Sequence, residues 1–154
     1  MKKWRIYTNH ELCSGCRACT TACAISHRGV ADPSRGAIQI LRDEFSGYEF
    51  QAVCRLCEEP ECVAACMAAA LEREPGTGRI IFDEERCIGC WMCVMVCPHH
   101  AIVRDEKAGK VIRCDQCAER DLPACVAACS TGAIQCAEIE EVSEEDEAIV
   151  RDEK

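Results

Sequence analysis

Four cysteines stand close together near the middle of the chain, and a proline follows the last of them. Cys87, Cys90, Cys93 and Cys97 are separated by two, two and three residues in the stretch C-I-G-C-W-M-C-V-M-V-C-P. With this spacing a tight loop can turn three thiolates onto one iron–sulfur cube, while the fourth thiolate reaches a second cube. We expect Cys97 to lie at the start of a helix, and Pro98 to keep a regular helix from running through the turn.

Three further groups of four cysteines also begin with C-x2-C and end with C-x3-C. They are Cys13, Cys16, Cys19 and Cys23; Cys54, Cys57, Cys62 and Cys66; and Cys114, Cys117, Cys125 and Cys129. The middle gap is two residues in the first of these groups, four in the next and seven in the last. Sixteen of the seventeen cysteines are thereby used, which matches the requirement of four [4Fe–4S] clusters. The remaining one, Cys136, is expected to be a small buried residue.

Short segments that could position these loops lie between the cysteine groups. β-Branched and alternating residues predict strands at 4–8, 37–41, 48–53, 79–82, 101–103, 110–112 and 132–135. Helices are predicted over 19–26 and from the start of 62–71. The strands 37–41 and 48–53 form a hairpin insertion, and 101–103 is expected to pair with 110–112. Gly89 would let the backbone pass close to a sulfide.

The composition indicates a small domain whose core depends on its cofactors. The chain has 154 residues and is only 5% aromatic, so ordinary side chains would provide a thin core. Clusters held by covalent bonds can fill that gap, and we expect the metal-free chain to be largely unfolded. Residues 1–137 are expected to form the cluster-binding domain, and residues 138–154 an acidic tail in which 143–146 resembles a helix start.

Charge and hydropathy exclude several classes of partner. The net charge is −9, most of it in the tail, and no basic patch indicates nucleic-acid binding. No apolar segment is long enough to span a bilayer, and no apolar signal region follows the basic start. The chain is therefore expected to be cytoplasmic, where clustered cysteines indicate metal rather than disulfides.

The cysteine pattern resembles the four-cluster electron-transfer subunits of the hydrogenase and dimethyl-sulfoxide-reductase small-subunit type. The resemblance covers about residues 4–136. It implies an α+β fold of two fused ferredoxin-like (bacterial dicluster) units, with short strands, short helices and large cluster-binding loops. Short members of this family serve carbon monoxide dehydrogenases, tungsten or molybdenum aldehyde or formate oxidoreductases, and hydrogenases.

The resemblance also implies how the cysteine groups combine. In the family the first group (13–23) pairs with the fourth (114–129), and the second (54–66) with the third (87–97). One cluster would take Cys13, Cys16, Cys19 and Cys129, and its neighbour Cys114, Cys117, Cys125 and Cys23. The inner pair would take Cys54, Cys57, Cys62 with Cys97, and Cys87, Cys90, Cys93 with Cys66. Two departures are that a proline follows only the third group, and that His99-His100 replaces a small residue and glycine.

Four functions are compatible with these residues. The first is an electron-transfer subunit that relays single electrons between a large catalytic redox subunit and a second redox partner. The second is a free polyferredoxin that diffuses between enzymes. The third is an enzyme with a substrate-binding cluster, although no catalytic constellation or nucleotide fingerprint is present and every iron would be fully ligated. The fourth is a zinc scaffold, but zinc modules usually show paired C-x2-C units separated by long gaps.

Overall fold

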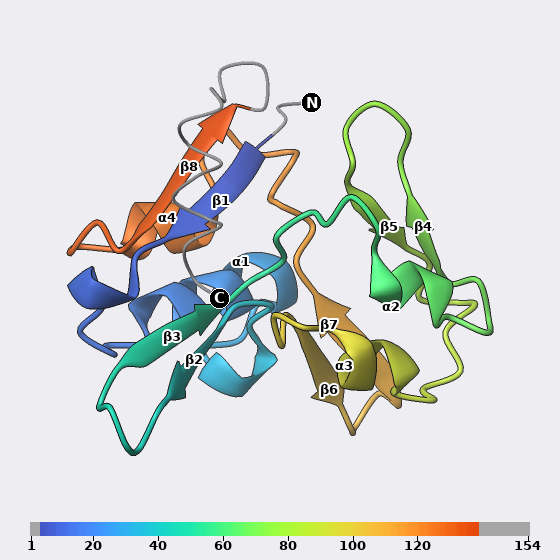
Figure 1. Cartoon of the computed structure of the whole chain (residues 1–154), viewed down its shortest axis with the longest axis horizontal. Helices are drawn as coiled ribbons and strands as arrows, with labels where there is room; N and C mark the ends of the chain where they lie inside the picture. Colours follow the sequence, from blue (N-terminus) through green and yellow to red (C-terminus); the bar gives the residue numbers. More distant parts are fainter. Residues whose placement is uncertain (1–3, 139–154) are drawn as a thin grey trace.

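The computed structural model of the chain describes residues 4–138. It contains eight short strands and four α-helices in that range, connected by long cysteine loops (Figure 1). The strands are β1 (Trp4–Thr8), β2 (Gln39–Arg42), β3 (Glu49–Ala52), β4 (Leu71–Arg73), β5 (Ile80–Phe82), β6 (Ile102–Asp105), β7 (Lys110–Arg113) and β8 (Ile134–Glu138). The helices are α1 (Ala18–Arg28), α2 (Glu61–Ala64), α3 (Met92–Val96) and α4 (Ala124–Ala128), with 3₁₀ turns η1 (His10–Leu12) and η2 (Pro33–Arg35). The tail and its expected helix start fall almost entirely outside the described residues.

The strands form four two-stranded antiparallel sheets. Three of them join neighbouring strands, β2 with β3, β4 with β5, and β6 with β7. The fourth joins the two ends of the described chain, with Trp4 opposite Glu138 and Thr8 opposite Ile134. The predicted pairings within the insertion and between 101–103 and 110–112 are confirmed, with bounds shifted by one or two residues. Strand β4 was not predicted.

Two helical predictions differ from the structure. The helix that begins in the second cysteine group ends at Ala64, and Leu71 already lies in β4. Ala69 adopts a left-handed backbone with φ of 47°, which interrupts a helix and turns the Ala70 N–H onto Cys66 Sγ at 3.3 Å. Cys97 follows the end of α3 rather than starting a helix, and its extended backbone is the conformation favoured before a proline.

Two hydrophobic clusters form the interior. One joins Ile6, Ile38, Val53 and Ile134 with cysteines of the first and fourth groups. The other joins Leu71 and Ile80 with cysteines of the second and third groups. The hairpin β6–β7 serves both, because alternate residues of a strand point to opposite faces. Its Ile112 packs in the first cluster, and its Val111 in the second.

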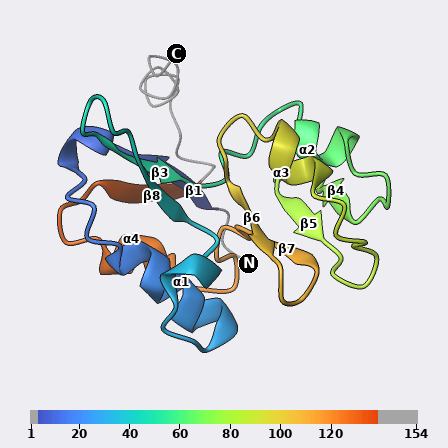
Figure 2. The same ribbon diagram turned by 90° about the horizontal axis from the view of Figure 1, so that it is seen from below.

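The elements separate into two neighbouring groups around these clusters. Figures 1 and 2 show β1, β8, α1, α4 and the β2–β3 hairpin together, and α2, α3 and strands β4–β7 beside them. Helix α1 packs on α4, and α2 packs on α3. Over residues 4–138 no helix has both the length and the hydropathy needed to cross a membrane.

The segment 32–53 links the two groups of elements. Asp32 caps the turn η2 by accepting a hydrogen bond from Ser34 N at 3.0 Å. From that turn, Arg35 Nη2 reaches Asp105 Oδ2 on β6 at 2.6 Å. The Asp105 side chain is almost fully buried, so this ion pair holds the insertion against the β6–β7 hairpin at a fixed place.

Candidate iron–sulfur centres

Each cysteine group begins with the same backbone turn. The residue just before the second cysteine has a left-handed conformation in all four groups, at Gly15, Leu56, Gly89 and Gln116, with φ between 52° and 68°. Glycine adopts this conformation without steric cost, whereas Leu56 and Gln116 must be held in it by packing. Both are almost fully buried, and Gln116 Nε2 also donates to the carbonyl oxygen of Cys54 at 2.8 Å.

Gly89 lies against the backbone of another element. A Cβ atom at this position would fall well inside contact distance of the Gly109 carbonyl oxygen. The close approach is therefore made by the turn between β6 and β7. Lys110, which follows that turn, donates from Nζ to the carbonyl oxygens of Glu84 and Cys87, so the same turn is fastened to the third cysteine group.

The thiols of the first and fourth groups lie near one another. The pKa of the Cys19 thiol is raised to about 11, first by burial and to a smaller extent by negative charge on Cys13, Cys129 and Cys16. These four residues are called set 1. Burial also strongly raises the pKa of Cys125, and negative charge on Cys117, Cys23 and Cys19 contributes to the rise. Cys114 is almost fully buried, and its neighbours among the thiols are Cys54 of the second group and Cys125 of its own group. Cys23, Cys114, Cys117 and Cys125 are called set 2.

The thiols of the second and third groups also lie near one another. Cys54, Cys57, Cys62 and Cys97, called set 3, line one cavity together with Ile80, Pro98 and Arg113. Burial raises the pKa of Cys62 to about 11, while the positive charge of Arg113 opposes that rise. Cys66, Cys87, Cys90 and Cys93, called set 4, line a second cavity with Trp91 and Leu71.

A repeated alanine follows the last cysteine of every group. Ala37, Ala70 and Ala101 donate their backbone N–H to the Sγ atoms of Cys23, Cys66 and Cys97 at 3.3–3.4 Å. In the fourth group Cys129 has Thr131 and the N–H groups of Ala133 and Ile134 as partners. Burial alone would raise the pKa of Cys129, but these hydrogen bonds hold it below its ordinary value.

The alanine repeat was missed in the sequence, although a signal for it exists. Ala70, Ala101 and Ala133 each stand four residues after the last cysteine of a group, and an isoleucine or leucine follows each of them. The 10-residue insertion after the first group moves the equivalent Ala37-Ile38 away from Cys23 and conceals the fourth copy. All four alanines are buried, and the next residue packs in one of the two cores.

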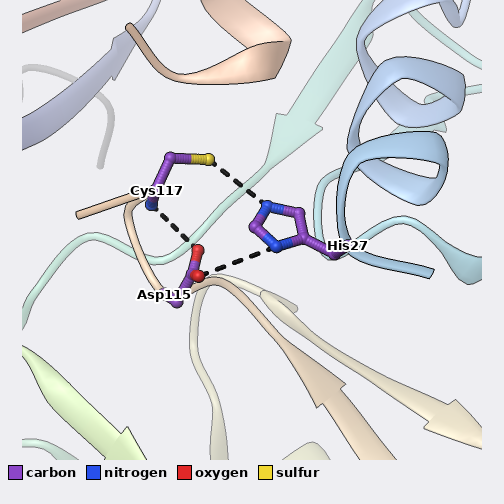
Figure 3. A group of neighbouring side chains, drawn as sticks. All are labelled: His27, Asp115 and Cys117. Carbon is purple, nitrogen blue, oxygen red and sulfur yellow. Dashed lines mark hydrogen bonds and ion pairs between the residues drawn. The ribbon is translucent and has the colours of Figure 1, made fainter. Parts of the chain in front are cut away.

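One charged group and one imidazole touch the thiols directly. Arg113 Nη2 lies 3.6 Å from Cys54 Sγ in set 3. In set 2, His27 at the end of α1 places its ring between Cys117 and Asp115, as Figure 3 shows. The Nε2 atom is 3.4 Å from Cys117 Sγ, and Nδ1 is 3.7 Å from Asp115 Oδ2.

Cys136, two histidines and Trp91 are not members of the four sets. Cys136 is on β8 opposite Ile6, and it is half-buried. The His10 ring stacks on Phe50 and meets Tyr48 edge to face. His100 adopts a left-handed backbone in the turn after Cys97. Trp91 precedes α3, and the Arg104 guanidinium lies 5.8 Å from its ring centre.

The donor sets fit [4Fe–4S] clusters. Each set offers four thiols, the number that one cubane requires. Backbone N–H groups already point at the sulfur atoms, as they do around ligating thiolates whose charge must be stabilised. The chain therefore supplies both the ligands and their hydrogen-bonding partners from its own residues.

The sequence profile of the 4Fe-4S dicluster domain matches residues 45–139. The chain belongs to this family. The expected class of iron–sulfur protein and the expected type of cofactor are thereby confirmed.

Relatives of this dicluster protein include electron-transfer components from several organisms. The "NADH-dependent phenylglyoxylate dehydrogenase subunit beta" of Aromatoleum evansii is 40% identical over 80% of this chain but only 28% of its own length. The "putative electron transport protein YsaA" of Escherichia coli K12 is 36% identical over 84% of this chain and 87% of its own. An "aliphatic sulfonate oxidoreductase, polyferredoxin-like subunit" of Pyrococcus furiosus is 35% identical over 82% and 70%.

A solved structure shares the arrangement of the elements. It is the "active site complex BamBC of Benzoyl Coenzyme A reductase", with a TM-score of 0.55 and 25% sequence identity. The similarity covers 97% of this dicluster protein and 87% of the matched chain. The relatives are named for electron transport or as subunits of oxidoreductases. They confirm the expectation that the chain is an electron-transfer component and not itself a catalytic enzyme.

Proposed function

We propose that this chain relays single electrons through four [4Fe–4S] clusters, held by sets 1 to 4, within an oxidoreductase complex. The observation that carries the proposal is the grouping of sixteen thiols into four sets of four. When bound, the clusters supply the one-electron chemistry. The polypeptide fixes their spacing, excludes water from them and adjusts their potentials through hydrogen bonds and charges.

The sets follow one another in a row, which supports a relay. Cys125 of set 2 lies near Cys19 of set 1. Cys114 of set 2 in turn lies near Cys54 of set 3. Sets 3 and 4 are joined by the short helix α2, which carries Cys62 and is followed by Cys66. Because electron tunnelling weakens steeply with distance, a row of closely spaced centres carries current better than scattered ones.

We infer that sets 1 and 2 with the elements around them, and sets 3 and 4 with theirs, are two ferredoxin-like units. The separate hydrophobic clusters support this division, since each contains cysteines of only one pair of groups apart from Cys54. Strands β1 and β8 close the first unit. The second unit is inserted between its halves, so the first unit is discontinuous along the chain.

The two ends of the row are proposed to face the two redox partners. Among the seventeen cysteines, all within the described residues, only Cys16 of set 1 and Cys90 of set 4 are exposed. Exposed apolar side chains accompany both: Leu12 precedes the loop that carries Cys16, and Ile88 lines the same cavity as Cys90. Apolar patches of this kind are typical of interaction sites.

One end would meet a large catalytic redox subunit, and the other a second electron-exchanging subunit or carrier. The catalytic subunit is proposed to be of the carbon monoxide dehydrogenase type, or of the tungsten or molybdenum aldehyde or formate oxidoreductase type. The alternative is a free polyferredoxin. Purification under anaerobic conditions distinguishes them, because a subunit remains with a large chain at stoichiometric ratio and a carrier is obtained alone.

Iron analysis tests the relay itself. The anaerobically prepared chain should contain about sixteen iron atoms, four for each cube. Replacing Cys97 by Ser should remove about four of them or shift the spectrum of one cluster, whereas Cys136→Ser should change neither. A chain with about four zinc ions and no visible absorption would eliminate the relay.

A further inference from the structure

Three consecutive residues lie at the junction between sets 2 and 3. Strand β7 ends at Arg113, the almost fully buried Cys114 belongs to set 2, and Asp115 follows it. The Cys114 thiol has Cys54 of set 3 as a close charged neighbour. The tripeptide Arg113-Cys114-Asp115 therefore separates the two middle sets and places one charge on each side of the boundary.

Arg113 directs its positive charge at set 3. Its Nη2 atom lies 3.6 Å from Cys54 Sγ, and its Nη1 atom donates to the carbonyl oxygen of Ile80. The side chain lines the same cavity as the four thiols of set 3. Its charge also acts on Cys62, where it opposes the rise in pKa that burial causes. Arg113 is half-buried, so water screens this charge only in part.

Asp115 directs its negative charge at set 2. One carboxylate oxygen accepts a hydrogen bond from Cys117 N at 2.8 Å, and the other lies 3.7 Å from His27. After burial, its charge contributes to raising the pKa values of Cys23 and Cys117.

Two arginines oppose Asp115 more weakly. Arg28 acts on Cys23, and Arg120 on Cys117, each with a smaller effect than that of Asp115. Asp115 is itself 55% exposed, so we expect its effect on set 2 to be smaller than that of Arg113 on set 3.

We propose that Arg113 and Asp115 create a step in reduction potential between the two middle centres, with set 3 above set 2. Reduction adds one electron and one negative charge to a centre, with no bond broken and no proton transferred. A nearby cation stabilises the reduced form and a nearby anion destabilises it. An electron in the relay therefore resides at set 3 in preference to set 2. This inference rests on the proposed function, because it requires a cluster in each set.

A redox titration of the loaded full-length chain, followed by electron paramagnetic resonance, tests the step. In Arg113→Gln, which keeps hydrogen-bond donors but removes the charge, one centre should become harder to reduce. At a fixed solution potential its ratio of reduced to oxidised form should fall about tenfold, or ~59 mV for one electron. Arg113→Lys should restore most of the ratio. Arg42→Met, which removes a 69% exposed cation on β2, should leave every step unchanged.

Asp115→Asn provides the second arm of the test. It should make a different centre easier to reduce, by less than tenfold, and because Asp115 is exposed this variant is expected to keep its iron. If Arg113→Gln loses iron, the Asp115→Asn result decides. If both variants keep about sixteen irons and no reduction step of the titration moves, the proposed potential difference is wrong but the relay is not. The same conclusion follows if both variants shift the same centre. A wild-type chain without clusters overturns the proposed function instead.

Discussion

Left-handed backbone residues determine the shape of the cysteine loops. Two of the four equivalent positions are glycines, and two are bulky buried residues, Leu56 and Gln116. The same local geometry is therefore reached in two ways, by a residue without a side chain and by one locked in place by its surroundings. The two glycines also have different surroundings, because Gly15 lies against the Glu49 side chain and Gly89 against the Gly109 carbonyl oxygen.

Gly89→Ala should be far more damaging than Gly109→Ala. Both residues have positive φ, so alanine costs roughly 1 kcal/mol at either position. At Gly89 the new methyl group would also collide with the Gly109 carbonyl oxygen, which raises the loss to ~3 kcal/mol. At Gly109 nothing lies within 4 Å of the added atom. Urea midpoints of the two loaded variants check this, and equal midpoints would contradict the close approach.

Cys136 should behave differently from the other sixteen cysteines. In the loaded chain it should be the one thiol open to alkylation, and it should react slowly at neutral pH. Burial raises its pKa, so less of it is the reactive thiolate than in an ordinary cysteine. The rate should increase as the pH approaches that raised pKa. Mass spectrometry after iodoacetamide treatment measures it, and more than one modified cysteine would show that a cluster ligand had been misassigned.

At the scale of elements, the segment 32–53 is tied to β6 by an ion pair whose carboxylate, that of Asp105, is buried. Arg35→Met would leave Asp105 buried with its charge unpaired by arginine, although Ala108 N still donates to its other oxygen at 3.2 Å. Breaking such a pair costs about 3 kcal/mol. The matched change Arg86→Met, in an exposed pair with Glu72, should cost less than about 1 kcal/mol.

A double variant, also measured by its urea midpoint, tests whether the unpaired charge causes the loss. Adding Asp105→Leu to Arg35→Met should recover much of the lost stability, because no unpaired charge then remains buried. Failure of the double variant to recover would indicate that Asp105 acts mainly through the turn it forms with Ala108.

Element prediction from the sequence succeeded where hydrophobic alternation dominates. Strands β1, β3, β6 and β7 follow it and were found within two residues of their bounds. Prediction failed in 62–71, where an alanine-rich stretch favours helix but Cys66 receives the Ala70 N–H, which requires the chain to turn. Tertiary contacts with the thiols thus override local propensity after the cysteines.

At the scale of the whole molecule, sequence spacing predicts sixteen candidate ligands but not which groups meet. The grouping into sets depends on long-range contacts such as β1 with β8 and α1 with α4. Arg113, Asp115 and His27 could not be found by spacing either. They carry no motif, and His27 is 90 residues away from the thiol that it touches.

Removal of iron should unfold most of the chain. Cysteines make up a large part of both hydrophobic clusters, and each set brings four thiols together without any other bond between them. Metal-binding free energy in such small domains is folding free energy. Removal of the iron with a chelator under anaerobic conditions should therefore abolish protection from proteolysis across residues 4–138. A metal-free chain that stays protected would show that the hydrophobic core is sufficient for folding without clusters.

The loaded and metal-free chains should respond to pH with opposite signs. In the metal-free chain, burial raises the pKa values of Cys19, Cys62 and Cys117 to about 11. A raised pKa in the folded form stabilises folding below the ordinary thiol pKa, and this contribution is lost as the pH rises through 9 towards 11. Any residual structure of the metal-free chain should thus disappear in alkali.

In the loaded chain the thiolates are bound, and protons compete with iron, so cluster loss should accelerate as the pH falls. Circular dichroism of the metal-free chain and cluster absorbance of the loaded chain, each followed from pH 6 to about pH 11, measure both trends. Parallel trends would mean that the buried thiols do not carry the metal.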